Sequence, residues 1–459
     1  MDLAKIFSGI LPGNDNYNKD KAEKLEVPVI NRECTLDEAA DIIQTMGLEQ
    51  INPDWIETMR KAAGGNKEKE NECISVLEKV LKEANIKING LGFAESAREL
   101  FIHKYGLGVL HELRNDKTID EIRVTPYGEV YVTRRGVNEK ISLVLSEKER
   151  KDLTERLIPP DIVGRTLNFS VPTLEVARED KTRLTALTRP VVDGIGFALR
   201  IADNLEINPQ TFIDMKTLDK RTWDILSVST KGRLNKLICG DVNTGKTTLL
   251  KALAGEFNDS ISIRVIDFSN ELMLHDLYPE REIWEVEVHD ERGADLRKLF
   301  ATVLRLTPDV IIIPEFRGVG EVDITLEAFT RGHHGSIVTA HFSADSNIKS
   351  ILRNIAILAI KEGLNIPIEA IIEKAAQAFN LVIQTEADSI TGVKKVVRIT
   401  EVYAIDGEII ENKIVEWTPF SDNYWGDGEW KIINRFSDRS YNHLIKNGVK
   451  REEIDNLFK

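Results

Sequence analysis

The stretch LNKLICGDVNTGKTTLLKALAGEF, residues 234–257, carries the strongest structural signal in the chain. A strand-like run, LNKLIC, comes first, the loop GDVNTGKT follows at 240–247, and the next residues have the apolar spacing of a helix. The loop matches the pattern G-x-x-x-x-G-K-[ST] at every fixed position and stands between a strand and a helix, as a phosphate loop must. The stretch therefore predicts a P-loop in an α/β domain with a mostly parallel sheet.

The chemistry of a P-loop assigns roles to its residues. Backbone N–H groups at a helix start bind phosphate oxygens, the Lys246 ammonium reaches the β- and γ-phosphates, and the Thr247 hydroxyl binds Mg²⁺. Asn243 stands where many such loops have a third glycine, and asparagine tolerates a positive φ well. ATP and Mg²⁺ are therefore the expected cofactors. The residues predicted to bind the nucleotide are Gly240, Asp241, Val242, Asn243, Thr244, Gly245, Lys246, Thr247 and Thr248.

A P-loop also needs a carboxylate at the end of a neighbouring strand, to hold the water shell of the metal or to activate the attacking water. Glu315 ends the run VIIIPEF, and the reach of a glutamate suits a base one water away from the γ-phosphate. Glu271, in IDFSNELML, is a second acidic candidate just past another predicted strand. The sequence pattern alone also allows either residue to be a surface side chain or a helix cap.

The stretch RGHHGSIVTAHFSAD, residues 331–345, contains three of the eight histidines. These histidines fit three hypotheses: metal ligands, a catalytic or nucleotide-sensing device, or polar residues at a strand edge. Their spacing matches no common zinc pattern, and no nearby Cys or acidic helix pair completes one. Nothing inside the stretch itself chooses among the three.

Composition narrows the classes of function. A chain of 459 residues is long enough for two or three domains, and 42% hydrophobic with 30% charged residues is typical of a soluble globular protein. The first residues lack the apolar core of a secretory signal, so we expect a cytoplasmic location. The net charge of −14 argues against a long contact with nucleic acid, although a local basic patch is compatible with it. Three widely spaced cysteines exclude a cysteine-rich zinc site.

Other segments differ in their periodicity. Residues 37–46 and 74–86 have helical spacing, and AAGGNKEKEN at 62–71 is typical of a solvated linker. IDEIRVTPYGEVYVTRRG at 119–136 alternates around a Pro-Tyr-Gly turn and predicts a β-hairpin. The alternating segment 393–419 predicts a further antiparallel strand pair.

Four boxes together make the sequence recognisable. The series GDVNTGKTT, IDFSNEL, LRLTPDVIIIPEFRG and RGHHGSIVTAHFSAD, in that order, resembles the secretion ATPase superfamily of type II and type IV secretion, type IV pili and Tad pili. Those proteins carry a Walker A loop, an acidic Asp box, a Walker B strand followed by Arg-Gly, and a histidine box. The resemblance covers roughly residues 105–435.

The resemblance implies roles for individual residues. Lys246 and Thr247 match the Walker A residues, and His341 is the stronger of two histidine-box candidates for sensing or positioning the nucleotide. Matches to the other boxes are Glu271 for the Asp box, Glu315 and Arg317 for Walker B, and His333 for the histidine box. Arginines of the N-terminal domain close over the nucleotide in the family, and Arg178, Arg183 and Arg200 fall in the matching segments. Each of these three could equally be a surface strand residue.

The chain departs from the family at several positions. Asp267 and Phe268 stand where the Asp box has Glu-Asp, and Pro314 replaces the glycine of Walker B, which a strand end tolerates. The four-cysteine zinc insertion of most type II and pilus-extension members is absent. The N-terminal and tail patterns resemble the Tad pilus and type IV secretion branch most.

The resemblance implies a hexameric ATPase motor, peripherally associated with the inner face of the membrane, that acts through an inner-membrane platform protein. The alternatives are a conjugative, DNA-transfer motor and a nucleotide-binding assembly scaffold with little turnover. The first hundred residues stand outside the resemblance, and their helical charge pattern suggests docking to the membrane partner. The predicted domains are a helical charged extension at 1–100, an α+β N-terminal domain at 101–205, a RecA-like P-loop ATPase domain at 206–420 and a C-terminal tail at 421–459.

Overall fold

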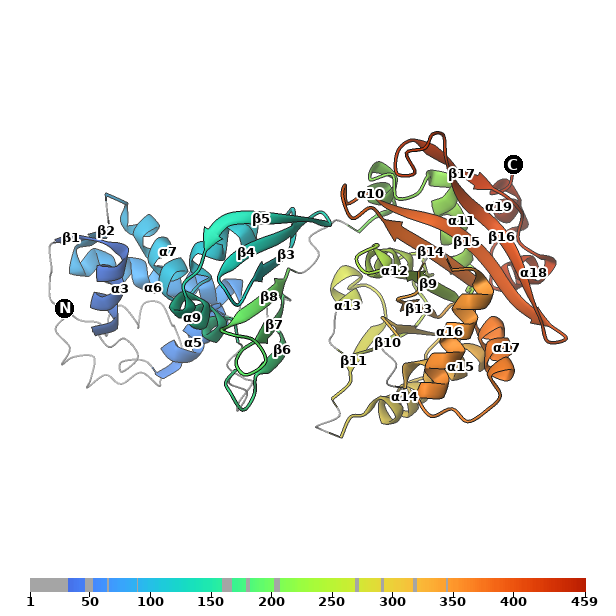
Figure 1. The fold of residues 1–459 in the computed structure, drawn as a ribbon, viewed down its shortest axis with the longest axis horizontal. Helices are drawn as coiled ribbons and strands as arrows, with labels where there is room; N and C mark the ends of the chain where they lie inside the picture. The colour runs from blue at the N-terminus through green and yellow to red at the C-terminus, as the bar shows by residue number, and fades with distance from the viewer. Residues whose placement is uncertain are drawn as a thin grey trace. The chain divides into compact units, whose positions relative to one another are not determined.

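The computed structural model describes residues 32–45, 53–63, 66–88, 90–158, 167–178, 182–201, 207–268, 272–289, 293–316, 320–343 and 346–459. The chain divides into two compact units, residues 1–204 and 205–459. Figure 1 draws the first unit in blue to green and the second in green to red. Both units combine helices with sheets, so the mixed α/β class predicted from the sequence is confirmed.

The first unit begins with a packed helical part. Its elements are β1 (Arg32–Cys34), α3 (Leu36–Thr45), α5 (Pro53–Ala63), α6 (Lys67–Ala84), β2 (Ile86–Ile88) and α7 (Phe93–Lys104). The two short strands pair in parallel, and the helices enclose a core that includes Ile43, Trp55, Leu77 and Phe101. The described part of the first hundred residues is therefore a folded helical assembly with its own core.

The linker predicted at 62–71 is wrong in its second half. The Asn66 side chain accepts a hydrogen bond from the Lys69 backbone N–H and caps α6, which begins at Lys67. The charged residues of this segment lie on the outer side of the first turns, while Cys73 and Leu77 on later turns are buried. A helix with a charged first turn and no early apolar residues has the composition of a linker, which explains the error.

The second part of the first unit is an antiparallel sheet. The chain passes through η1 (Gly108–Leu110), α8 (His111–Asn115), β3 (Ile119–Val124), β4 (Glu129–Arg134), β5 (Val137–Val144), α9 (Glu147–Leu157), β6 (Thr173–Ala177), β7 (Arg183–Leu187) and β8 (Gly196–Arg200). Within the described ranges the sheet has six strands in the order β5-β4-β3-β8-β7-β6. The predicted hairpin at 119–136 is present as β3 and β4. Ser146 and Glu149 form the capping box that starts α9.

The second unit is built on one large sheet. Its first half contains α10 (Pro209–Asp214), α11 (Lys220–Lys231), β9 (Lys236–Gly240), α12 (Lys246–Ala254), β10 (Ile263–Asp267), α13 (Leu274–Leu277), β11 (Ile283–Glu287), α14 (Leu296–Arg305) and β12 (Val310–Ile313). Its second half contains α15 (Glu321–Thr330), β13 (Ile337–Ala340), α16 (Ile348–Lys361), α17 (Ile368–Ala378), β14 (Leu381–Ala387), β15 (Lys394–Ile405), β16 (Glu408–Pro419), β17 (Gly428–Ile432), α18 (Asp438–Lys446) and α19 (Arg451–Asn456).

The strand order of this sheet places β9 near its centre. Counting described residues only, nine strands follow the order β11-β10-β12-β13-β9-β14-β15-β16-β17. The strands from β11 to β14 are parallel, and β15, β16 and β17 continue the sheet antiparallel, as the alternating pattern at 393–419 predicts. Parallel strands joined by helices must be covered on both faces, which requires apolar side chains on both sides of each strand.

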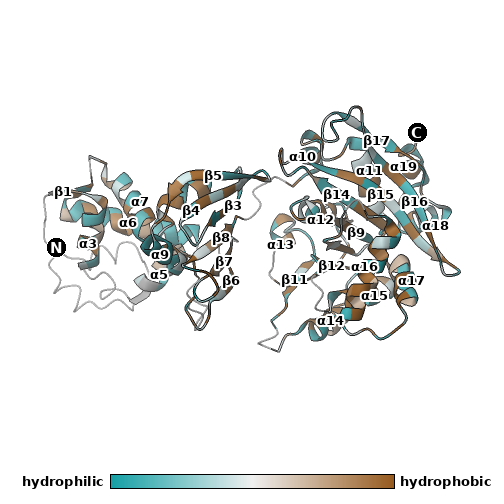
Figure 2. Ribbon diagram, in the orientation of Figure 1, coloured by the Kyte–Doolittle hydropathy of each residue, from teal (hydrophilic) through white to brown (hydrophobic). Residues whose placement is uncertain are grey.

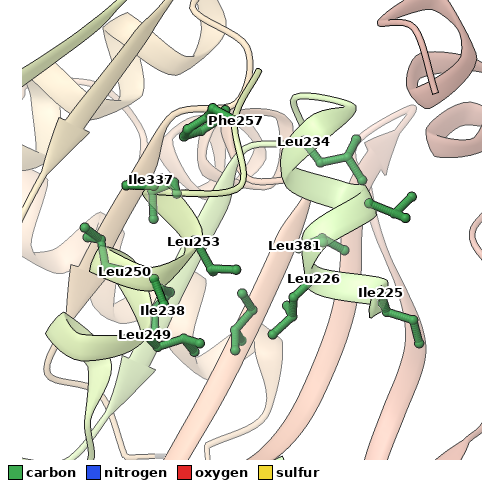
Figure 3. Packing of buried hydrophobic residues seen from close by; sticks show 14 of the residues in the cluster. Ile225, Leu226, Leu234, Ile238, Leu249, Leu250, Leu253, Phe257, Ile337 and Leu381 are labelled. Carbon is green, nitrogen blue, oxygen red and sulfur yellow. The ribbon is translucent and has the colours of Figure 1, made fainter. Parts of the chain in front are cut away.

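Helices cover the two faces of the sheet with separate cores. Ile238 of β9 packs on one face with Ile225 of α11 and Leu250 of α12, as Figure 3 shows from close by. Leu237 and Cys239 of the same strand belong to the core of the opposite face, which contains side chains of α14 to α17. Figure 2 shows the corresponding apolar colouring of the central strands. No helix in the ranges described above is both long and apolar enough to cross a membrane.

The last forty residues belong to this second unit. Leu444 of α18 and Ile454 of α19 are fully buried in the same core as α11 and α12. A Cβ on Gly232, just after α11, would overlap a methyl group of Leu444, so α11 and α18 approach closely at this glycine.

Replacing Leu444 by alanine should lower the free energy of unfolding of the second unit by about 2–5 kcal/mol, because a fully buried leucine leaves a cavity. Urea denaturation followed by tryptophan fluorescence measures this, since every tryptophan except Trp55 lies in residues 205–459. Lys446→Ala in the same helix is the control and should change the value by less than about 0.5 kcal/mol. Equal effects of the two variants would contradict the packing described for α18.

Candidate nucleotide-binding site

The predicted P-loop follows a strand that is buried along its whole length. All five residues of β9 are buried, and the strand ends at Gly240. A Cβ at Gly240 would overlap the backbone oxygen of Thr385, because β14 pairs with β9 up to this residue. Glycine is thus required here by the close approach of a neighbouring strand.

The loop itself turns through two residues with positive φ. Asn243 has φ 64° and Gly245 has φ 87°, and α12 begins at Lys246 directly afterwards. The left-handed conformation of Asn243 agrees with the tolerance expected of asparagine at this point. Asp241, Val242 and Asn243 are exposed at the tip of the loop. The N-terminus of α12 therefore faces solvent through an exposed loop, as an anion site at a helix start requires.

A chain of hydroxyl groups fixes the buried side of the loop. The Thr244 hydroxyl lies 3.0 Å from the Asp241 carbonyl oxygen and 2.8 Å from the Thr385 hydroxyl oxygen, and it donates its single proton to one of the two. The Thr385 hydroxyl in turn lies 3.2 Å from the Cys239 carbonyl oxygen, to which it donates. These contacts join the loop to β14 and to the end of β9.

Lys246 is folded back over its own loop. Its ammonium donates to the carbonyl oxygens of Gly240 at 3.0 Å and Asp241 at 2.7 Å, and to Nδ1 of His341 at 3.1 Å. Only 5% of the residue is exposed. Burial lowers the pKa of Lys246 to about 8, although the nearby Glu315 carboxylate acts in the opposite direction. The lysine is therefore still charged at neutral pH, although burial destabilises the charged form. An anionic ligand beside it would stabilise that form.

His341 connects this lysine to the predicted Walker B glutamate. Because an ammonium can only donate, Nδ1 of His341 accepts, and its Nε2–H donates to Glu315 Oε1 at 2.7 Å. His341 follows β13, whose last residue pairs with β9, and Glu315 follows β12 on the other side of β13. Three segments that are far apart in the sequence thus meet at the carboxyl edge of the sheet, which is where α/β proteins bind ligands.

The groups at this site match the chemistry of a nucleotide bound with Mg²⁺. Backbone N–H groups of the loop and the Lys246 ammonium suit phosphate oxygens, and the half-buried Thr247 at the start of α12 offers a hydroxyl oxygen to Mg²⁺. Glu315 and Asp267, which ends β10 at the same edge, are carboxylates suited to the water shell of such an ion. Across the described ranges no group of three or more His, Cys, Asp or Glu residues could hold a metal without the nucleotide.

The structure does not bring His333 to this site, and its predicted contact with a nucleotide stays a prediction. His333 precedes β13, and its Nδ1–H donates to the Pro308 carbonyl oxygen, just before β12, at 2.9 Å. It therefore lies at the amino edge of the sheet, with the whole of β13 between it and His341. His334 is exposed, and its ring lies 5.0 Å from that of His443.

The other predicted residues fall into two groups. Glu271 and Arg317 lie outside the described residues, and their roles stay predictions. Arg183 and Arg200 belong to the first unit, where they are cross-strand neighbours on β7 and β8 and point away from its core. Arg178 is buried there and donates to the Ala63 carbonyl oxygen at the end of α5, and its contact with a nucleotide stays a prediction.

The sequence patterns missed two residues that contact the loop. Thr385 and Lys394, both from the β14–β15 hairpin, hydrogen-bond to the loop residues Thr244 and Asn243. Neither lies in a recognised box, because the boxes cover the segments just after β9, β10, β12 and β13. The alternating pattern at 393–419 predicts strands in this segment, but it does not predict which other strand of the sheet they pair with.

The profile of the family described as type II/IV secretion system protein matches residues 102–394, well over half of the chain. The chain belongs to this family. The match confirms the resemblance to the secretion and pilus motor ATPase superfamily that the four boxes indicate. It ends at Lys394, the first residue of β15, so the rest of β15, the strands β16 and β17 and the C-terminal helices lie beyond it.

Individual relatives are distant. MJ0900, an uncharacterized protein of Methanocaldococcus jannaschii, is 22% identical over 379 residues, which cover 77% of this chain and 65% of that protein. The conjugal transfer protein TrbB of Rhizobium radiobacter is 26% identical over 227 residues, covering 49% of this chain and 65% of TrbB. The crystal structure of the VirB11 ATPase of the Brucella suis type IV secretion system aligns with 64% of this chain and 93% of that one, at 19% identity and a TM-score of 0.35. The family assignment rests on the profile match alone.

Replacing Thr385 by valine should lower the free energy of unfolding by about 1–2 kcal/mol, because the shape is kept while two buried hydrogen bonds are lost. It should also increase amide hydrogen exchange in residues 240–246. Denaturation with urea and exchange followed by mass spectrometry measure the two effects. Thr302→Val, at an exposed position of α14, is the control. Unchanged exchange in the loop of the Thr385 variant would contradict the role described for the Thr385 hydroxyl.

Proposed function

We propose that the protein is an ATP-hydrolysing hexameric motor that powers protein secretion or pilus assembly through an inner-membrane platform protein. One observation carries the proposal. A continuous chain of hydrogen bonds runs beside the loop with the P-loop pattern, from Lys246 through His341 to Glu315. Membership of the type II/IV secretion system family supports the biological setting. The proposed location is cytoplasmic, at the inner face of the membrane.

The geometry suggests how the residues would act on ATP. Lys246 would exchange its carbonyl and histidine partners for the β- and γ-phosphate oxygens, which are stronger acceptors. Its withdrawal from His341 would free Nδ1, and His341 would keep Glu315 oriented through Nε2 while the carboxylate accepts a proton from the attacking water. Glu271 would add a second carboxylate to the site, and Arg317 would add a guanidinium. Mg²⁺, held by Thr247 and phosphate oxygens, would neutralise charge that develops during the transfer.

Arginines of the N-terminal domain are proposed to finish the site. Arg183 and Arg200 form an adjacent pair on one face of their sheet, a suitable arrangement for a polyphosphate. Their approach would couple nucleotide binding to movement between the proposed domains 101–205 and 206–420, and hydrolysis would reverse it. Such closure would be the mechanical step that is passed to the platform protein.

A conjugative motor is the second candidate, because the similar protein TrbB is named as a conjugal transfer protein. The net charge of −14 argues against direct contact with DNA and so against this candidate. Tight, salt-sensitive binding of the purified chain to DNA would favour this candidate over secretion or pilus assembly.

Replacing Glu315 by glutamine should lower ATP turnover about a hundredfold or more, because the proposed base is lost while its size is kept. In the wild-type protein, activity per chain should rise with protein concentration as the proposed hexamer forms. A phosphate-release assay over a wide concentration range measures both. Glu408→Gln, an exposed residue in β16, is the matched control and should retain full activity.

Two results would contradict this function. Equal activity of the Glu315→Gln and wild-type proteins would place the chemistry elsewhere. Nucleotide binding without turnover at any concentration would support the assembly scaffold instead.

Nucleotide affinity should fall as the pH rises above 8. Since burial lowers the pKa of Lys246 to about 8 in the free protein, the lysine is mostly neutral at pH 9. Bound phosphate favours the charged form, so binding must then take up a proton, and Kd should rise up to about tenfold per pH unit. Calorimetry with ADP at pH 7.5–9.5, in buffers of different ionisation enthalpy, measures Kd and proton uptake. A constant Kd across this range would contradict the proposed phosphate contact of Lys246.

A further inference from the structure

Lys394 lies against the proposed phosphate loop. It is the first residue of β15, and its ammonium donates to Oδ1 of Asn243 at 3.3 Å. Its Cδ lies 3.4 Å from the point that a Cβ on Gly245 would occupy. The side chain therefore runs along the two residues with positive φ that shape the loop, and its positive charge lies at the loop tip.

The next residue is anchored in an aromatic layer. Lys395 is 1% exposed, and its ammonium lies 3.8 Å from the ring centre of Trp417 and 5.2 Å from that of Trp430. The two indoles are cross-strand partners on β16 and β17, and the Trp430 N–H donates to the Val396 carbonyl oxygen at 2.7 Å. A desolvated ammonium over two indoles is a favourable cation–π contact.

We propose that Lys394 is a second phosphate-binding cation of this site, and that the aromatic layer of Trp417 and Trp430 positions it through Lys395. The ligand would be the polyphosphate of a nucleoside di- or triphosphate, so the inference rests on the proposed function. The profile match of the family ends at Lys394, and both tryptophans lie beyond it. The contact would therefore make the C-terminal strands of this chain part of its nucleotide site.

Physical reasons favour a phosphate contact over a purely structural tie. The hydrogen bond to Asn243 is long and is made to a neutral amide, whereas a phosphate oxygen beside the loop would be a stronger, charge-assisted acceptor. The backbone of Lys394 is held at both sides, by pairing with Ala387 in β14 and by the anchored Lys395. Holding the backbone while the ammonium remains at the loop tip lowers the entropy cost of binding.

The test compares two substitutions of Lys394 in the full-length protein. Lys394→Gln removes the charge but keeps a donor for Oδ1 of Asn243, and Lys394→Met removes both. Binding of N-methylanthraniloyl-ADP with Mg²⁺ is measured by fluorescence at several NaCl concentrations. We expect both variants to raise Kd about five- to tenfold and to show a weaker dependence of Kd on salt. Lys361→Gln, an exposed residue at the end of α16, should bind like the wild type.

The outcomes separate the inference from the proposed function. If Lys394→Gln binds like the wild type, with an unchanged salt dependence, the phosphate contact is refuted whatever Lys394→Met does. A loss confined to Lys394→Met would identify a structural tie to the loop. If the wild-type protein itself fails to bind the ADP analogue, the proposed function is overturned and this inference with it.

The positioning role of the aromatic layer has its own test. Lys395→Met keeps an unbranched side chain beside the indoles but removes the cation–π contact and the hydrogen bond to the Lys216 carbonyl oxygen. We expect it to raise Kd for the ADP analogue about two- to threefold in the wild-type background and to have no effect in the Lys394→Gln background. Equal effects in the two backgrounds would show that Lys395 does not act through Lys394.

Discussion

The second unit depends on the position of β9, a strand that is buried on both faces and paired in parallel on both edges. Parallel pairing makes every neighbouring strand end at the same edge of the sheet, so the segments that follow them converge. The loop after Gly240, His341 after β13 and Glu315 after β12 are brought together in this way. Close strand pairing also demands glycine at the point where the chain leaves β9 for the loop.

Burial of Lys246 is the main electrostatic feature of this edge. An ammonium that is almost fully removed from water keeps its charge only with good acceptors, and here two carbonyl oxygens and one imidazole nitrogen provide them. These neutral acceptors only partly offset the loss of hydration, which is why the pKa of the lysine is lowered. A charged ligand at the loop would satisfy the same ammonium better, and the network around it would then rearrange.

The antiparallel strands beyond the family match add a second connection to the loop. They extend the sheet on the side of β14, and two of their tryptophans contact the ammonium of Lys395, which follows the residue that contacts Asn243. The C-terminal helices pack on the same face as α11 and α12, so the end of the chain is joined both to the core and to the loop region. The part of the chain beyond the family match thereby contacts the loop that lies within the match.

The sequence alone determined the features that depend on local chain geometry. The P-loop pattern, the positive φ at Asn243, the hairpin at 119–136 and the start of α9 all follow from residues close together in the chain. Tertiary structure alone decided which distant residues meet. His333 and His341 belong to one sequence motif, yet β13 separates them and sends them to opposite edges of the sheet. Thr385 and Lys394 reach the loop only because β14 pairs beside β9, and strand order is set by packing across the whole sheet rather than by any local pattern.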